Sequence, residues 1–208
     1  MNVHSLRKQE THLESRAMEV LMMKKLKMAV LLSAAIAVLA ASLAGAEDYI
    51  PQKAGAEYIG QTLSFETVDV EDNPVSSADL FAENEITMVN LWGTWCPACM
   101  SEMEELAEIH KEFREKDCGI VGVELEYDWS DETVNASNKT IEQNGIEYPN
   151  VKLPLDNELL VSITLYPTSL FVDKDGKILA SPIVGAVPAA YSQTLESLLA
   201  EILAGNAR

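Results

Sequence analysis

Metal-binding side chains are scarce in this sequence of 208 residues, which contains three cysteines and three histidines. Cys96 and Cys99 lie three residues apart, but a structural zinc site needs four Cys or His ligands. Two of the histidines lie within the first 12 residues, far from this pair. Met100 follows the second cysteine, where covalent haem attachment needs a histidine. The sequence therefore argues against zinc and haem, and we expect no metal or organic cofactor.

Basic side chains are few beyond residue 46. Residues 47–208 carry 30 acidic and nine basic side chains, which gives a net charge of −21. Nucleic acid is an unfavourable partner for such a surface, because phosphate contacts need Lys and Arg. We interpret the acidic excess as a solvated surface that aids solubility.

A hydrophobic run long enough for a typical membrane span is absent as well. The apolar stretch Ala29–Ala41 is shorter than the ~20 residues that a spanning helix needs. Three lysines precede it, and Ala44-Gly45-Ala46 gives a small-residue cleavage pattern after it. Residues 23–46 are therefore predicted to be a signal peptide, with a membrane anchor as the alternative. Either choice places the remaining chain outside the cytoplasm.

The segments around this leader suggest the following organisation. Residues 1–22 carry mixed charge ahead of the apolar stretch, which indicates a start codon assigned too early or a short tail. Residues 47–57 are predicted to be a tether. Residues 58–208 are long enough for one domain.

Cys96 and Cys99 carry the strongest chemical signal in the sequence. They follow the apolar run Ile86–Trp92, and Pro97 suits the first turn of a helix. Two thiols at this spacing can exchange disulfides, since the first attacks a disulfide and the second resolves the mixed disulfide. A helix N-terminus would favour the thiolate of the first cysteine. A purely structural disulfide remains the alternative. Cys118 is predicted to be a small packed thiol, with a third redox partner as the alternative.

Periodicity along the chain predicts alternating strands and helices. The order indicates an α/β architecture with a mixed central sheet flanked by helices, plus an N-terminal β extension. The expected strands cover 86–92, 119–125, 168–172 and 177–183, the last two as a hairpin across an Asp-Gly turn, with short strands between 59 and 72. The expected helices cover 76–81, 97–116, 133–143, 156–163 and 188–204, and residues 149–154 are expected to be extended.

The stretch Val89–Cys99 resembles the active-site strand and helix start of the thioredoxin superfamily. More specifically, it is similar to the TlpA/ResA-type extracytoplasmic thiol–disulfide oxidoreductases, over roughly residues 58–204. The resemblance implies a thioredoxin-like fold, with Cys96 as a nucleophile exposed at the helix start and Cys99 as the buried resolving thiol. A peroxiredoxin site would instead have proline and threonine seven and three residues before its cysteine, where Val89 and Gly93 stand.

The resemblance also implies a proton-handling residue. Glu102, six residues after Cys96, matches a glutamate that many TlpA/ResA-type members have near their thiols. On a helix it lies one turn after Cys99 and shares its face. Thioredoxins place a buried acid where this sequence has Asn90, which cannot take a proton. That difference strengthens the expectation for Glu102, although an exposed helix glutamate remains the alternative.

A substrate-binding surface is implied in the same way. Tyr166-Pro167 lies where thioredoxin-like folds carry a cis proline, beside the thiols. The backbone of Tyr166 would meet a bound substrate segment there, and Trp95 and Pro97 would border Cys96.

The function predicted from these residues is the reduction of extracytoplasmic protein disulfides. The resemblance implies substrates such as apocytochrome c or other extracytoplasmic protein disulfides, and a membrane electron donor that keeps the dithiol reduced. We expect a monomer. Two alternatives stay open. The dithiol could oxidise substrates, because direction depends on its reduction potential. The chain could also be a non-catalytic module that binds peptides beside Pro167 by β-augmentation.

Overall fold

The computed structural model describes residues 55–126 and 128–205. These residues fall within one compact unit, Pro51–Arg208. The predicted signal segment at 23–46, the segment before it and most of the predicted tether lie outside the described residues. Within the described ranges, no helix is both long enough and apolar enough to cross a membrane.

A five-stranded mixed sheet, in the order β5-β4-β3-β6-β7, lies at the centre of this unit. Strands β3 (Ile86–Trp92) and β4 (Cys118–Glu124) run parallel, and every residue in them is buried. Such continuous burial explains their nearly unbroken apolar sequences. Strand β5 (Asn150–Lys152) extends the parallel side beside β4, where the sequence predicted only an extended segment. Strands β6 (Thr168–Asp173) and β7 (Ile183–Val184) are antiparallel to their neighbours.

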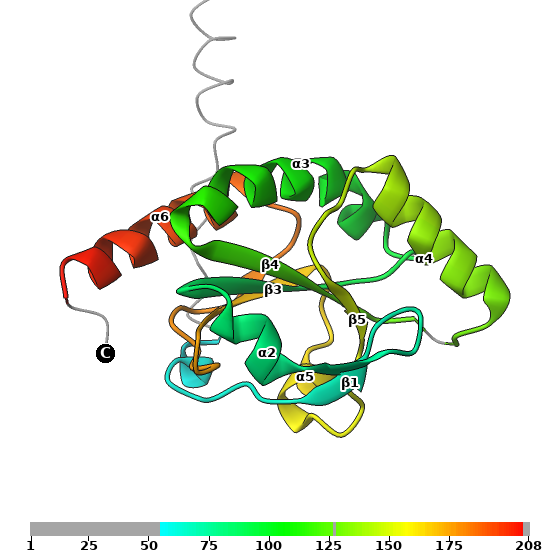
Figure 1. Ribbon diagram of the computed structural model, residues 1–208, viewed down its shortest axis with the longest axis horizontal. Coiled ribbons are helices and arrows are strands. Elements are labelled where there is room, and N and C mark those ends of the chain that lie inside the picture. The colour runs from blue at the N-terminus through cyan, green and yellow to red at the C-terminus, as the bar shows by residue number, and fades with distance from the viewer. Residues whose placement is uncertain (1–54, 127, 206–208) are drawn as a thin grey trace, which may run out of the picture. The chain divides into compact units, whose positions relative to one another are not determined.

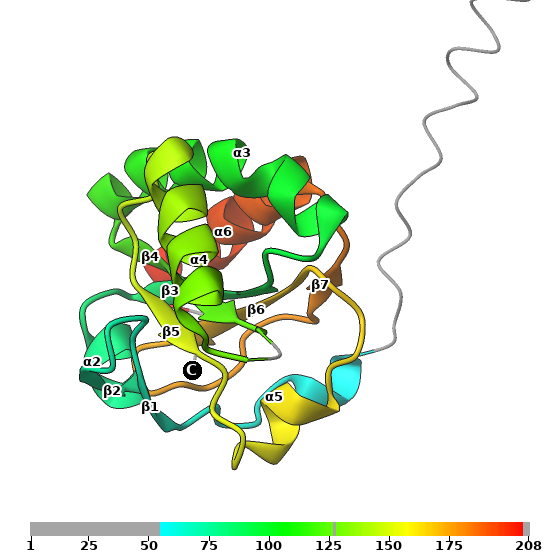
Figure 2. The same ribbon diagram turned by 90° about the vertical axis from the view of Figure 1, so that its right-hand side faces the viewer.

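Helices cover both faces of the sheet, as Figures 1 and 2 show from two sides. Helices α3 (Pro97–Phe113), α4 (Asp131–Gln143) and α6 (Pro188–Leu203) lie on one face. The short helices α2 (Ser77–Ala82) and α5 (Glu158–Ser162) lie on the other. Each face therefore has its own apolar core, and the predicted layered α/β architecture is confirmed.

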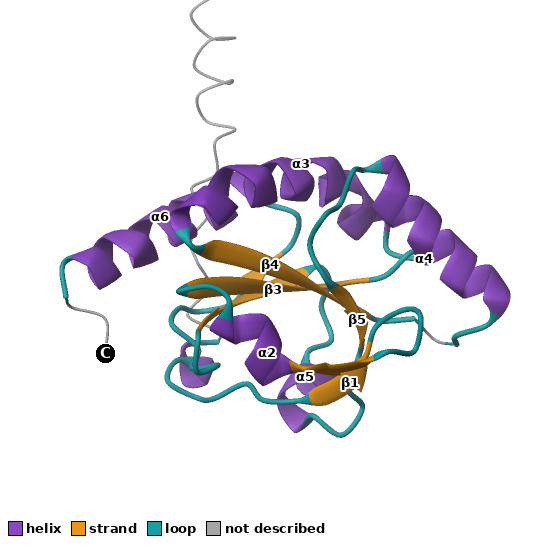
Figure 3. Ribbon diagram, viewed as in Figure 1, coloured by secondary structure: helices purple, strands orange, loops and turns teal. Residues whose placement is uncertain are grey.

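The predicted N-terminal β extension is a small hairpin beside the main sheet (Figure 3). Strands β1 (Glu66–Val68) and β2 (Pro74–Ser76) pair antiparallel to each other. A 3-10 turn, Ala56–Tyr58, precedes them, and a second one, Arg114–Lys116, continues the predicted long helix beyond the end of α3.

The predicted strand Lys177–Ile183 is wrong over most of its length. Strand β7 contains only Ile183–Val184. Ahead of it, Ile178 makes an isolated bridge to Val172 rather than a continuous ladder. The chain leaves the edge of β6 after this bridge and pairs with it again only from Ile183. Pro182, just before that point, has no N–H to donate and cannot continue a ladder.

Glycine at position 122 makes room for a buried hydrogen bond near the end of β3. The Trp92 indole Nε1 donates to Asn150 Oδ1 at 3.0 Å, and Asn150 Nδ2 donates to the Tyr148 carbonyl at 3.0 Å. A Cβ on Gly122 would lie 1.9 Å from Asn150 Oδ1 and 2.8 Å from Trp92 Nε1. The amide of Asn150 is held at both ends, so it cannot move aside without losing a buried bond.

We therefore expect Gly122→Ala to lower the free energy of unfolding by about 1–3 kcal/mol, the usual cost of overpacking. Urea denaturation measures it. Gly119→Ala in the same strand is the control, because its Cβ would meet the end of the Asn84 side chain, which can rotate away. Equal stability of the two variants would contradict this account.

Candidate active site

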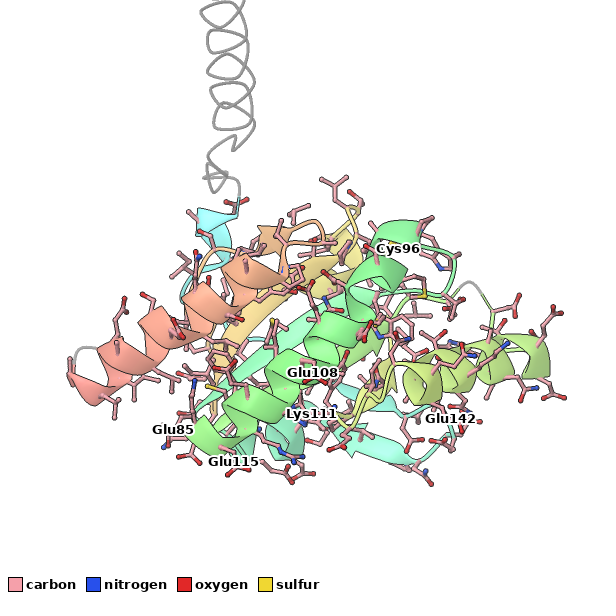
Figure 4. All side chains as sticks on the ribbon, turned by 90° about the horizontal axis from the view of Figure 1, so that it is seen from above. Glu85, Cys96, Glu108, Lys111, Glu115 and Glu142 are labelled. Carbon is pink, nitrogen blue, oxygen red and sulfur yellow. A yellow bond between two sulfur atoms is a disulfide. The ribbon has the colours of Figure 1, made fainter. Side chains whose placement is uncertain are left out.

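Cys96 and Cys99 form a disulfide at the N-terminus of helix α3. Figure 4 labels Cys96 at that end of α3, with Glu108 and Lys111 farther along the helix. Cys96 is the N-cap residue, and its Sγ accepts the N–H of Cys99 at 3.2 Å. Pro97 occupies the first helical turn, where a missing N–H removes no helical bond. After reduction, the free N–H groups and the helix dipole would stabilise negative charge on the Cys96 sulfur.

The expectation of an exposed Cys96 is wrong for this disulfide form. Cys96 is only 6% exposed, and Cys99 is completely buried, as predicted. The Cys96 sulfur is drawn inward, because it is bonded to the buried sulfur of Cys99 and also accepts that residue's N–H. The disulfide therefore lies at a nearly closed surface rather than on a protruding side chain.

Trp95 and Tyr166 join the loop before Cys96 to the loop before β6. Their rings lie edge to face, with centroids 5.8 Å apart and planes at 83°. Trp95 is 39% exposed, and its Nε1 donates to the Leu125 carbonyl at 3.0 Å. The Tyr166–Pro167 peptide bond is cis, as predicted. The predicted substrate-binding residues of the two loops therefore lie next to each other beside the disulfide.

Glu102 is buried one helical turn after Cys99, with 1% of its surface exposed. Its Oε1 accepts a bond from Asn90 Nδ2 at 3.1 Å, and its Oε2 lies 2.8 Å from the Tyr191 hydroxyl. The same hydroxyl lies 2.7 Å from the Gly185 carbonyl. A tyrosine hydroxyl has one proton, so it can bond fully to both oxygens only when Glu102 contributes a proton of its own. The geometry therefore suits a protonated Glu102.

The direction in which the pKa of Glu102 is shifted agrees with this geometry. Burial raises the pKa of Glu102 from its ordinary 4.5 to about 7. The bonds from Tyr191 and Asn90 favour the charged form and oppose the rise, and the nearby charge of Glu105 adds to it. Removal of the Glu102 carboxyl from water is the largest of these effects on its pKa. Glu102 can therefore gain and lose a proton near neutral pH, as a proton-handling group must.

The hydrogen bonds of Glu102 extend toward the cis proline. Asn90 Nδ2 also lies 3.1 Å from Ser169 Oγ in strand β6. The Gly185 N–H donates to the Pro167 carbonyl at 2.8 Å. The sequence alone did not predict Ser169 and Tyr191 as hydrogen-bond partners of Asn90 and Glu102. A signal for Tyr191 was present, since a buried tyrosine needs a partner for its hydroxyl.

Cys118 is separate from this site. It pairs with Ile86 at the start of β3, whereas the disulfide follows the other end of that strand. Its thiol is free and buried, and burial raises its pKa to about 11. The prediction of a packed thiol is confirmed. Among the described residues, no group of three or more His, Cys, Asp or Glu side chains could hold a metal ion.

Comparison with known proteins places the chain in a family. Residues 59–181 match the AhpC/TSA family, which is more than half of the chain, and the chain belongs to that family. A curated relative, the thiol-disulfide oxidoreductase ResA of Bacillus thuringiensis (strain Al Hakam), is 29% identical over 117 residues. The match covers 55% of this chain and 63% of the relative, so the chain spans less than two thirds of that protein.

Solved structures confirm the thioredoxin-like fold. One is the thioredoxin domain of a thiol-disulfide oxidoreductase from Bacteroides vulgatus, with a TM-score of 0.56 and 24% identity over 68% of this chain and 97% of that one. Another is a thioredoxin-family thiol:disulfide interchange protein from Chlorobium tepidum TLS, with a TM-score of 0.55 and 26% identity over 68% and 96%. The predicted resemblance to ResA-type proteins is also confirmed.

The raised pKa of Glu102 predicts a pH-dependent stability. A carboxyl with a raised folded-state pKa stabilises the fold at low pH, and this stabilisation is lost as pH rises from 4.5 to about 7. Glu102→Gln removes this effect, so the stability difference between variant and wild type should change by up to about 3 kcal/mol in favour of the variant between pH 4.5 and 8. Urea denaturation across pH measures it, with exposed Glu104→Gln as the control. A pH-independent difference would show that Glu102 does not titrate in this range.

Proposed function

We propose that this member of the AhpC/TSA family is an extracytoplasmic thiol–disulfide oxidoreductase that reduces protein disulfides through Cys96 and Cys99. The observation that carries the proposal is the Cys96–Cys99 disulfide at a helix N-terminus, with a buried carboxyl one turn away and with the preceding residue, Trp95, in contact with Tyr166 of the cis-proline loop. A relative named thiol-disulfide oxidoreductase supports it.

The first step needs the reduced protein. The Cys96 thiolate attacks one sulfur of a substrate disulfide, which forms a bond between Cys96 and the substrate and breaks the substrate's S–S bond. The departing substrate thiolate takes up a proton. The position of Cys96 as the N-cap of α3 supports its role as the attacking group, because the helix end favours its thiolate.

The second step regenerates the disulfide described above. Cys99 loses its proton and attacks the Cys96 sulfur, so that Cys96–Cys99 forms and the second substrate thiolate leaves and is protonated. Two electrons and two protons pass to the substrate in all. Glu102 is the proposed acceptor of the Cys99 proton, since it lies one turn away on the same helix face and titrates near neutral pH.

The substrate would lie along the loops that border the disulfide. We assign Trp95, Pro97, Tyr166 and Pro167 to this surface. The edge-to-face contact of Trp95 with Tyr166 supports the assignment, because it holds the two loops together next to Cys96. An extended substrate segment could pair with the backbone at Tyr166, which is how thioredoxin-like folds are expected to present a target cysteine.

The reducing direction is supported by the residues between the two cysteines. Pro97 and Ala98 add neither charge nor imidazole to stabilise the Cys96 thiolate strongly, as a strong oxidant requires. The signal peptide or anchor predicted at 23–46 supports an extracytoplasmic location. We propose a monomer that reduces protein disulfides, apocytochrome c among them, and that is reduced in turn by a membrane electron donor.

Replacement of Cys99 by serine should trap the proposed intermediate. Without the resolving thiol, Cys96 stays bonded to its substrate, so we expect Cys99→Ser to accumulate mixed disulfides when expressed with its leader in a bacterial host. Non-reducing gels and mass spectrometry of the purified adducts would identify the bond through Cys96. The captured partners would name the substrates.

Cys96→Ser is the matched control and should capture nothing. The binding-module alternative predicts that both variants give the same result, because an inert disulfide takes no part in exchange. Absence of Cys96-linked adducts in Cys99→Ser would therefore argue strongly against the enzyme.

A further inference from the structure

Helix α4 is attached to the sheet by a polar contact. Of its 13 residues, only Ser137 is fully buried. The Ser137 hydroxyl donates to Oε2 of Glu124, the last residue of β4. Helices on a sheet usually pack through an apolar stripe, whereas the apolar contribution of α4 to the neighbouring core is the partly buried Ile141. The bond between Ser137 and Glu124 is therefore the buried anchor of this helix.

Glu124 is an unusual residue for this place. It is completely buried and pairs in register with Trp92, at the end of the sheet where the disulfide lies. Its second oxygen, Oε1, has no hydrogen-bond partner among the described residues. Burying such a group is costly. The proposed reaction does not use it.

The residues that follow Glu124 hold the loop before Cys96. The Leu125 N–H donates to the Trp92 carbonyl at 2.8 Å, and the Leu125 carbonyl accepts the Trp95 indole N–H at 3.0 Å. Next, Glu126 Oε1 accepts the N–H of Thr94 at 2.7 Å. Leu125 and Glu126 therefore make hydrogen bonds to Trp92, Thr94 and Trp95, which are three of the four residues of segment 92–95. A displacement of the β4 end would move this loop and, with it, the N-cap cysteine.

We propose that Glu124 and Ser137 are positioning residues of the thiol site: their hydrogen bond fixes α4 to the end of β4, so that the following residues hold the loop before Cys96 in place. Neither side chain touches the disulfide in this scheme. An effect of these two residues on catalysis presupposes the proposed function, whereas an effect on the reactivity of the Cys96 thiol does not.

A carboxyl gives this anchor a dependence on pH. Burial raises the pKa of Glu124 from 4.5 to about 7, against the bond from Ser137 and the attraction of Lys152 on β5. Glu126, after β4, and Glu71, between β1 and β2, add repulsion. The buried hydroxyl of Tyr148 adds no charge, because burial keeps its pKa far above neutral. The bond from Ser137 itself favours the ionised carboxyl, but the larger cost of burying that charge makes the end of β4 and the attached helix most stable at low pH and less stable as pH rises toward and through about 7.

Two variants separate the effect of the hydrogen bond between Ser137 and Glu124 from the effect of ionising Glu124. Ser137→Ala removes the donor and leaves the carboxyl unpaired, whereas Glu124→Gln keeps an oxygen acceptor for Ser137 but cannot ionise. Asn135→Ala and Glu132→Gln, at exposed positions of the same helix, are the matched controls. The first measurement is amide hydrogen exchange of α4 at pH 5 to 8. The second is the rate at which iodoacetamide alkylates Cys96 of the reduced protein over the same range.

We expect exchange in α4 to be about tenfold faster in Ser137→Ala than in wild type, which is the effect of losing roughly one buried hydrogen bond. The alkylation midpoint of Cys96 should move to higher pH in the same variant, because a displaced loop stabilises the thiolate less. Glu124→Gln should keep α4 protected and remove the decline in protection with rising pH. Both controls should follow wild type.

If Ser137→Ala speeds hydrogen exchange in α4 but leaves the alkylation profile of Cys96 unchanged, the hydrogen bond between Ser137 and Glu124 only holds the helix, and the positioning role is overturned. Unchanged exchange in Ser137→Ala would overturn the anchor itself. Failure of the wild-type dithiol to reduce a peptide disulfide would count against the proposed function alone, since alkylation and hydrogen exchange require no turnover.

Discussion

The burial of a carboxyl beside two thiols is the constraint on which the rest of this site depends. Glu102 lies one turn after Cys99 and has almost no contact with solvent. Its oxygens are satisfied by Asn90 from the central strand and Tyr191 from the last helix. The Tyr191 hydroxyl has a single proton and also lies near the Gly185 carbonyl. It can bond to both oxygens only when Glu102 is protonated and donates to it. The buried hydrogen bonds around Glu102 therefore favour its protonated form.

The fold brings these groups together from distant parts of the sequence. Strand β3 carries Asn90 and ends at Trp92. Cys96 is the N-cap of helix α3, which starts at Pro97, so the disulfide lies at the carboxyl end of the parallel strands. Strand β4 ends at the same edge with Glu124, a second buried carboxyl. Both carboxyls have a pKa raised to about 7 by burial. The same edge therefore combines the reactive sulfurs with two groups that respond to pH in the neutral range.

Much of the fold and part of the site could be predicted from the sequence. Continuous apolar runs located β3 and β4, and the Cys96–Cys99 spacing with Pro97 located the start of α3. The failures have physical causes. Strand 177–183 was overextended because an Asp-Gly turn predicts a hairpin, whereas Pro182 interrupts the ladder. The bonds of Glu102 to Asn90 and Tyr191 join residues 12 and 89 positions apart. Local patterns contain no information about such contacts, and the same holds for Glu124 with Ser137.

Thiolate absorbance in the ultraviolet, followed across pH in the reduced protein, tests most directly whether Glu102 shares the proton chemistry of the dithiol. Wild type should titrate in overlapping steps, because the carboxyl and the thiols influence one another. In Glu102→Gln the first thiol should titrate at lower pH, since the repulsion from an ionised neighbour is gone. Superimposable curves for the two proteins would contradict the account and remove Glu102 from the site.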